Sequence, residues 1–318
     1  MDFAEALHFL AERAGVTIPT YSRPDTRKDE KERIYQANEL ATQFFHSLLL
    51  NSPAGEKVNK YLTGRGLVPQ TIASFKLGLS PDSWEALKQH LLERGYNEDE
   101  MLQAGLIIAS EQGKTHDRFR NRLMFPIKDA RGHIIGFGAR ALDDSMPKYL
   151  NSPQTAVFDK SSNLYGIDAA APAIRQQQLV VIVEGYMDVI IAHQYGFHNV
   201  VASMGTSITE DQMGHLKRLT RNVTLALDPD AAGEEAMLRC LHYENELEAE
   251  IKVIVLPEGK DPDEVIKEDP GCWAKLVEQS RPVVDCTFDN LLTGLDLTKA
   301  RDKQAVVDSL LPVVAGIA

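Results

Sequence analysis

The 318-residue chain has few cysteines, no long apolar run and no overall excess of basic charge, and each absence excludes a class of protein. Its three cysteines, Cys240, Cys272 and Cys286, lie far apart, which argues against a disulfide framework and against a CxxC zinc pair. No stretch approaches the ~20 apolar residues that span a bilayer, and the N-terminus lacks the pattern of a secretory signal. We therefore expect a cytoplasmic protein with no membrane partner and no zinc.

The charge of the chain is acidic but unevenly distributed. With 34 basic and 46 acidic residues, the net charge of −12 argues against a nucleic-acid binder on composition alone. Between Lys114 and Lys148, however, eight basic residues accompany only four acidic ones, which gives this stretch a local charge of +4. We call this stretch the basic strip, and it suits a protein that holds phosphate groups.

Two apolar segments are each followed directly by acidic residues. Residues 180–183 precede Glu184, and residues 223–227 precede Asp228 and Asp230. Nearly every residue in these segments is aliphatic, which predicts strands that are buried on both faces. Further strands are expected at 200–205 and 251–259, with apolar residues at helical spacing between the strands. Such alternation predicts a doubly wound parallel sheet, whose ligands gather at the carboxyl ends of the strands.

The acidic residues would therefore meet at one edge of the sheet. Asp228 and Asp230 are two residues apart in an extended segment, so their side chains leave on the same side. Carboxylate oxygens are the ligands that Mg²⁺ prefers, and a pair of such ions can clamp both oxygens of a phosphoryl transfer. Each acid taken alone could instead cap the helix that follows it. Three acids at one edge would repel one another without cations, which favours metal binding and nucleotide chemistry.

Several segments of the chain resemble segments of a known protein family. The segments 184-EGYMD-188, 228-DPD-230 and 257-PEGKDPDEV-265 resemble the Toprim module of bacterial primases, topoisomerases and some nucleases. Segments 63-TGRGL-67, 118–140 and 147–166 resemble the RNA-polymerase core of DnaG-type bacterial DNA primases. The resemblance runs over nearly the whole chain, and its motifs occur in the order found in that family.

The resemblance implies roles for the acidic residues. Glu184 matches the Toprim glutamate, a general base or metal ligand, and Asp228 and Asp230 match the metal-binding pair, so these three are the expected catalytic residues. Asp188, Asp261 and Asp263 match further acidic positions and complete the expected set of ligands for Mg²⁺ or Mn²⁺. Asp188 could instead be a first-turn helix acid, and the other two could be capping acids around Pro262.

The resemblance also implies roles for the basic residues. Those expected near the reacting nucleotide are Arg140, Lys148 and Lys160, together with Asn151, which could equally be a turn residue. Those expected to contact nucleic acid are Arg65, Arg118, Arg120 and Arg122. Arg118 and Arg120 could instead lie on the solvated outer face of a strand.

We expect an α/β protein with three parts. An N-terminal α+β subdomain with the basic strip would cover residues 1–175, a Toprim domain 176–267, and a helical segment 268–318 that ends as if truncated. Within the first part, residues 20–33 are too polar for a core and suggest a linker or exposed arm. Residues 34–110 look mainly helical, and 119–142 look like antiparallel strands joined at Arg131 and Gly132.

These features predict a DNA-dependent RNA polymerase that makes short primers on single-stranded DNA from ribonucleoside triphosphates. The alternatives are a Toprim nuclease that cleaves phosphodiester bonds and a non-catalytic DNA-binding scaffold; a topoisomerase would need a nucleophilic tyrosine domain, for which no segment argues. Members of this family also carry a zinc-ribbon domain and a helicase-binding domain, so the chain looks like an excised core whose helicase partner binds elsewhere. The alarmones ppGpp and pppGpp would compete at the nucleotide site.

Overall fold

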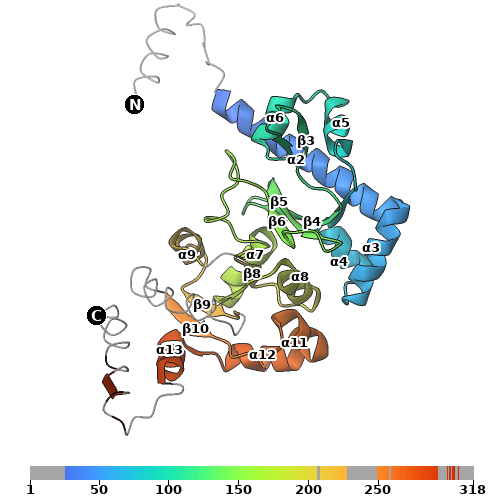
Figure 1. Cartoon of the computed structure of the whole chain (residues 1–318). Coiled ribbons are helices and arrows are strands. Elements are labelled where there is room, and N and C mark those ends of the chain that lie inside the picture. The colour runs from blue at the N-terminus through green and yellow to red at the C-terminus, as the bar shows by residue number, and fades with distance from the viewer. Residues whose placement is uncertain are drawn as a thin grey trace, which may run out of the picture.

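The computed structural model describes residues 26–205, 208–227, 249–257 and 259–292, together with a few isolated positions after residue 298. Two units follow each other along the chain (Figure 1), an N-terminal unit around an antiparallel sheet and a parallel-sheet unit covered by helices. The N-terminal unit holds the elements α2 to β6, and the parallel-sheet unit holds the elements α7 to α13. In the described part of the chain, no helix is long and apolar enough to cross a membrane.

Five helices surround the sheet of the N-terminal unit. They are α2 (Thr26–Asn51), α3 (Pro53–Gly64), α4 (Pro69–Ser74), α5 (Ala86–Leu92) and α6 (Glu98–Gln103). The long helix α2 lies against the sheet and buries Phe45 edge-on against Phe137. A turn at residues 93–97 joins α5 to α6, and Asn97 caps α6 through a reciprocal capping box with Glu100.

Of the two interpretations of residues 20–33, a linker is wrong for the second half, since α2 already begins at Thr26, whereas the exposure of residues 29–32 fits an exposed arm. Lys, Glu and Arg are strong helix formers, so a charged segment without an apolar face can still extend a helix that is anchored further along. Arg33 supplies part of that anchor, because its Nε lies 2.7 Å from Oε1 of Glu100. Its guanidinium also lies 4.1 Å from the ring centroid of Tyr96.

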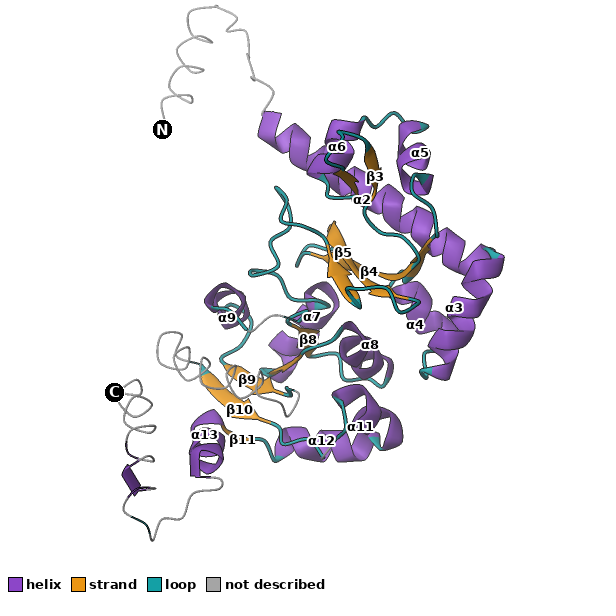
Figure 2. Ribbon diagram, viewed as in Figure 1, coloured by secondary structure: helices purple, strands orange, loops and turns teal. Residues whose placement is uncertain are grey.

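The antiparallel sheet has the strand order β1-β4-β5-β6 (Figure 2). Its strands are β1 (Gly78–Ser80), β4 (Arg122–Lys128), β5 (Ile134–Ala141) and β6 (Tyr149–Asn151); a separate hairpin pairs β2 (Ile107–Ala109) with β3 (Thr115–Asp117). The central hairpin of β4 and β5 confirms the expected pairing, and Gly132 turns between the strands with a φ of +88°. The segment 118–121 is not a strand, so Arg118 and Arg120 do not lie on an outer strand face.

The second sheet confirms the expected α/β class. Its strands are β7 (Val180–Val183), β8 (Val200–Ala202), β9 (Asn222–Leu225), β10 (Glu250–Val253) and β11 (Arg281–Pro282), in the order β11-β10-β9-β7-β8. The first four strands run parallel, whereas β11 is an antiparallel edge strand that the sequence pattern did not predict. The chain order reverses around β7 and β9, so a ligand site is expected at their carboxyl ends, where Glu184 follows β7.

Helices cover both faces of the parallel sheet. They are α7 (Ile167–Gln177), α8 (Tyr186–Gln194), α9 (Glu210–Lys217), α11 (Pro262–Glu268), α12 (Pro270–Glu278) and α13 (Val283–Leu292). Alternate residues of β7 point to opposite faces: Val181 and Val183 pack with α8, α11 and α12, and Val180 and Ile182 pack with α7, α9 and α13. This two-sided burial explains the continuous aliphatic run of the strand.

Two helices of this unit have clear end signals. Gly196, with a φ of +89°, follows the end of α8, and Thr209 and Gln212 form a capping box at the start of α9. Because β11 and α13 belong to the parallel-sheet unit, the boundary at residue 268 stays a prediction.

Candidate active site

A sharp bend after β7 places Glu184 at the carboxyl edge of the parallel sheet. Gly185 begins α8, and its backbone N–H donates to Oδ2 of Asp188 at 3.1 Å. A Cβ on Gly185 would lie 2.7 Å from that same oxygen, so a side chain there would displace the Asp188 carboxylate. The other oxygen of Asp188 accepts the backbone N–H of Asp263 at 3.1 Å. Asp188 therefore joins the start of α8 to the start of α11.

The two aspartates that flank Pro262 have different surroundings. The Asp263 carboxylate is buried, and its Oδ2 lies 2.8 Å from Nζ of Lys267 and 3.3 Å from a guanidinium nitrogen of Arg65. Asp261 makes no capping hydrogen bond with its side chain. Burial raises the pKa of Asp261, and the nearby carboxylates Glu264 and Asp263 raise it further. Asp261 therefore has the surroundings of a cation ligand, whereas Asp263 already has two cationic partners.

A cavity of about 430 Å³ collects several of the expected site residues. We call it the carboxylate cavity, and it is lined by Lys148, Tyr149, Asn151, Lys160, Glu184, Gly185, Tyr186, Asp188, Met204, Gly205 and Asp261. The carboxylates come from the β7–α8 bend and the start of α11, and the lysines come from the segments beside β6. Acidic and basic side chains from distant segments thus face one hollow, as binding of a metal-bound phosphate requires.

Asn151 is fixed on the wall of this cavity by two hydrogen bonds. Its amide nitrogen lies 3.5 Å from the Met204 carbonyl, and its amide oxygen accepts the hydroxyl of Tyr186 at 2.5 Å. Met204 has a φ of +63°, an uncommon conformation for a residue with a side chain. Tyr186 stacks on Phe125 with ring centroids 4.8 Å apart, and burial raises its pKa, so its hydroxyl stays a donor.

Two of the three basic side chains of the expected nucleotide site contact other groups of the protein. The Arg140 guanidinium donates to the Tyr61 hydroxyl and lies 5.0 Å from the Tyr61 ring centroid. It lines a separate cavity of about 680 Å³ with Lys57 and Asn121. Lys160 lies 3.5 Å from the Gly205 carbonyl, and burial lowers its pKa. Lys148 is exposed at the rim of the carboxylate cavity. Arg140 therefore lines a different cavity from the two lysines, although it pairs across β5 and β6 with Tyr149, the neighbour of Lys148 in the chain.

The arginines expected to bind nucleic acid mostly contact the protein itself. Arg118 donates to the Asn151 carbonyl at 3.1 Å, and Arg122 donates to the Pro147 carbonyl at 2.8 Å. Burial lowers the pKa of both arginines. Together they hold the segment that carries Lys148 and Asn151, so their contribution is to position the cavity wall.

Arg120 belongs to an exposed aromatic cluster that the sequence interpretation missed. Its guanidinium lies 4.0 Å from the ring centroid of Trp84, whose side chain is 62% exposed. His116 packs edge-on against the same indole, with centroids 4.9 Å apart. An exposed tryptophan beside an arginine is the combination that stacks on bases and holds a phosphate backbone. An isolated tryptophan within a helical segment gives no such signal in sequence.

The residues present fit a hard divalent cation. Asp228 and Asp230 lie outside the described residues, and within the described ranges no three acidic, histidine or cysteine side chains form a metal cage. The carboxylates of the cavity supply only oxygen ligands, and burial together with neighbouring carboxylates raises the pKa of Asp261, which a bound cation would offset. Glu184 and Asp188 also contact other groups of the protein.

Comparison with known proteins supports this picture. Residues 44–171 match the family model "DNA primase catalytic core, N-terminal domain", and residues 181–266 match the model "Toprim-like". The DNA primase of Clostridium acetobutylicum is 39% identical over 312 residues, which cover 96% of this chain and 50% of the relative. The Escherichia coli DNA primase is 33% identical over 325 residues, 100% of this chain and 56% of the relative. This chain thus spans about half the length of the curated relatives it matches.

Solved structures agree with the family matches. The RNA polymerase domain of Mycobacterium tuberculosis primase DnaG has a TM-score of 0.82 at 30% identity, covering 90% of this chain and 94% of that domain. A DnaG primase catalytic domain bound to single-stranded DNA has a TM-score of 0.80 at 33% identity, covering 91% and 94%. Fold and site together define a nucleic-acid enzyme core that contains a Toprim unit. This chain belongs to the DnaG-type DNA primase family, whose catalytic core it matches.

Proposed function

We propose that the chain is a polymerising core that joins ribonucleotides into short RNA primers on single-stranded DNA. The observation that carries this proposal is the carboxylate cavity, in which Glu184, Asp188 and Asp261 face Lys148 and Lys160. Polymerisation needs carboxylates for divalent cations and basic groups for the triphosphate in one place. In a chain of the primase family, that combination favours primer synthesis over phosphodiester cleavage or scaffolding.

In the proposed reaction, the acidic and the basic residues of the carboxylate cavity have different roles. Glu184, Asp228 and Asp230, with Asp188 and Asp261, would hold Mg²⁺ or Mn²⁺. When bound, these cations would neutralise the phosphates and activate the attacking 3′-hydroxyl. Because Asp263 is already paired with Lys267 and Arg65, we assign it and Arg65 to positioning Asp188 and α11.

The basic and amide groups would hold the incoming nucleotide. Lys148 and Lys160 would contact its phosphates as movable point charges, and Asn151, held by Tyr186, would fix its orientation. The relative solved with single-stranded DNA supports a DNA template. Template bases would stack on Trp84, and Arg120 would contact the phosphate backbone of the template. Arg140 would lie beside the template strand.

Extension of an RNA primer annealed to single-stranded DNA, with labelled ribonucleotides and Mg²⁺ or Mn²⁺, tests this proposal. We expect short RNA products, and we expect Glu184→Gln to lower the rate by at least about 100-fold while DNA affinity is largely kept. Glu278→Gln is the matched control, because Glu278 is exposed on α12 away from the cavity. Cleaved DNA would favour the nuclease, and equal activity of Glu184→Gln would remove this residue from the mechanism.

We extend the proposal to partners and location. The alarmones ppGpp and pppGpp carry pyrophosphates that would meet the same lysines, so they should displace a fluorescent ribonucleoside triphosphate from this site. No displacement at saturating alarmone would contradict that extension. A replicative helicase and a zinc-ribbon domain would act through regions outside the matched core, and a template-copying enzyme of this kind would work in the cytoplasm.

A further inference from the structure

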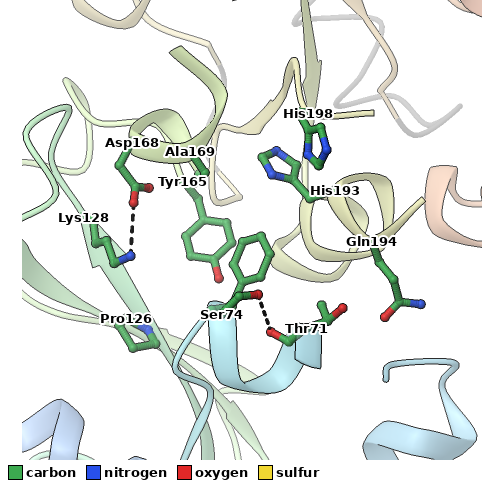
Figure 3. Close-up of a pocket in the computed structure, with 12 residues that line it drawn as sticks. Thr71, Ser74, Pro126, Lys128, Tyr165, Asp168, Ala169, His193, Gln194 and His198 are labelled. Atoms are coloured by element: carbon green, nitrogen blue, oxygen red, sulfur yellow. Dashed lines mark hydrogen bonds and ion pairs between the residues drawn. The ribbon is translucent and has the colours of Figure 1, made fainter. Parts of the chain in front are cut away.

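A second cavity, of about 250 Å³, lies where the N-terminal unit meets the parallel-sheet unit (Figure 3). We call it the junction cavity. Its lining includes Ser74, Phe75, Lys128, Tyr165, Asp168 and His193. None of the residues that line it also lines the carboxylate cavity. Primer synthesis as proposed above therefore does not account for it.

The hydroxyl of Tyr165 lacks a hydrogen-bond partner among the described residues, although the side chain is buried. Figure 3 shows this hydroxyl pointing into the cavity toward Ser74. Burial raises the pKa of Tyr165 well above its usual range, so the hydroxyl keeps its proton and remains a donor. A buried donor without an acceptor is unfavourable, and a bound molecule that offers an acceptor would relieve the deficit.

A donor and an acceptor stand side by side on the opposite wall. Nζ of Lys128 lies 3.1 Å from Oδ2 of Asp168, and both side chains are partly exposed to the cavity, at 24% and 20%. Their mutual contact leaves the second oxygen of Asp168 and further protons of Lys128 for a ligand. The pair thus presents an acceptor and a donor together.

The cavity favours a neutral occupant. Lys128 and Asp168 cancel each other, and among the described residues no other lysine, arginine or acidic residue lines the cavity, whose lining also includes His193 and His198. Burial lowers the pKa of His193, whose Nε2 lies 2.9 Å from the Val200 carbonyl, so this ring is neutral near pH 7. A phosphate group would therefore find no unpaired lysine or arginine among the described residues of the lining, which argues against a nucleotide.

Size and shape restrict the occupant further. The rings of Phe75 and Tyr165, with centroids 6.2 Å apart, give the cavity flat apolar walls. A volume of about 250 Å³ lies just below the range of cavities that take drug-sized molecules, so it suits a compound of one or two rings.

We propose that the junction cavity binds a small, neutral, planar heterocycle that carries a lactam edge, in which an N–H stands next to a carbonyl. The N–H would donate to Asp168, the adjoining carbonyl would accept from Lys128, and a second carbonyl would accept from Tyr165. Uracil carries this set of groups, either as the free base or within a nucleoside.

Ligand-observed fluorine NMR with 5-fluorouracil and the whole chain tests the proposal. We expect saturable binding with a Kd of about 1 mM or tighter, and displacement by uracil. The analogue 1,3-dimethyluracil keeps the ring but lacks both N–H groups, so it should not displace the probe. A uridine arm distinguishes the sources: displacement by uridine as well indicates a nucleoside, and displacement by uracil alone indicates the free base. No saturable binding, or equal displacement by 1,3-dimethyluracil, overturns the proposal.

Variants then locate the site. Tyr165→Phe removes only the hydroxyl and should weaken binding at least about fivefold, while the Tm without ligand stays equal or rises. Asp168→Asn should weaken binding by a similar factor or more. Tyr195→Phe, at an exposed tyrosine beyond the cavity, and Glu184→Gln, in the carboxylate cavity, should both bind like the parent. Unchanged binding by Tyr165→Phe, or loss of binding in Glu184→Gln, would contradict the assignment.

Discussion

At the scale of single residues, Tyr186 lines the carboxylate cavity and contacts several other residues there. Its hydroxyl holds Asn151, one face stacks on Phe125, and its ring meets Tyr165 edge-on with centroids 4.8 Å apart. Gly138 leaves the space that this ring occupies, because a Cβ there would lie 2.2 Å from Cζ of Tyr186. Tyr186 therefore depends on the absence of a side chain on the neighbouring strand.

Replacing Gly138 by alanine should displace Tyr186 and destabilise the protein. The added methyl group would overlap the ring within a packed region, which costs about 1 to 3 kcal/mol of the free energy of unfolding. Urea denaturation measures the loss, and primer extension should fall with it because Asn151 loses its anchor. Gly214→Ala is the matched control, since a Cβ there meets nothing within 4 Å and the position is helical. That control should be neutral or stabilising by up to about 1 kcal/mol, and equal effects of the two variants would contradict the steric argument.

Single residues also show how far the candidate site could be predicted from sequence. Acids after buried strands predicted a cluster at the sheet edge, and the structure places Glu184, Asp188 and Asp261 in one cavity; their roles remain predictions. Spacing could have indicated the pair of Asp263 with Lys267, four residues on, but not the pair with Arg65, which lies 198 positions away. Trp84 was missed for the same reason, since its partner Arg120 comes from another segment.

At the scale of elements, the start of α5 is completed by a residue outside the helix. Its N-cap residue, Glu85, makes no side-chain capping bond. Instead, the Asp117 carboxylate at the end of β3 accepts the backbone N–H groups of Leu87 and Lys88 at 2.8 and 2.9 Å. A strand thus supplies the cap that the local sequence lacks.

Asp117 should make the stability of this unit depend on pH. Burial raises the pKa of Asp117 to about 6, against about 3.9 in an unfolded chain, so the folded state binds its proton more tightly. The contribution of this group to stability is therefore fully present below about pH 4 and is lost as pH rises through about 6. We expect the free energy of unfolding of the parent to fall relative to Asp117→Asn by at most about 3 kcal/mol between pH 4 and pH 7. Denaturant unfolding across this interval measures the difference, and a constant difference would contradict the raised pKa.

The elements themselves were largely predictable where their pattern is local. The parallel strands and the hairpin of β4 and β5 followed from apolar runs and turn residues. The start of α2 and the edge strand β11 did not, because a charged helix end and a two-residue strand exist only through contacts with distant segments.

At the scale of the whole molecule, a few polar contacts join the two units. The Gln194 side chain at the end of α8 donates to the Gly66 carbonyl at 2.8 Å and accepts the Val68 backbone N–H at 2.9 Å. Arg65 in the same loop pairs with Asp263 of α11. The loop between α3 and α4 is therefore a polar joint between the N-terminal unit and the parallel-sheet unit, beside the apolar cluster that the two units share.

Gln194→Ala should loosen this joint without opening either core. Losing two partly exposed hydrogen bonds should lower the free energy of unfolding by about 1 kcal/mol and speed proteolysis in the loop at residues 64–69. Gln89→Ala, at an exposed site on α5, should change stability by less than about 0.5 kcal/mol and leave the cleavage pattern unchanged. Identical proteolysis of the parent and Gln194→Ala would show that the joint does not depend on this side chain.

Tyr165 lines the junction cavity, Tyr186 lines the carboxylate cavity, and the two rings are in edge-on contact. A compound bound against Tyr165 would therefore adjoin the support of Asn151 without occupying the space of an incoming triphosphate. Because coupling between two binding sites is reciprocal, any loss of triphosphate affinity that such a compound caused through Asn151 would be matched by an equal loss of its own affinity once triphosphate is bound.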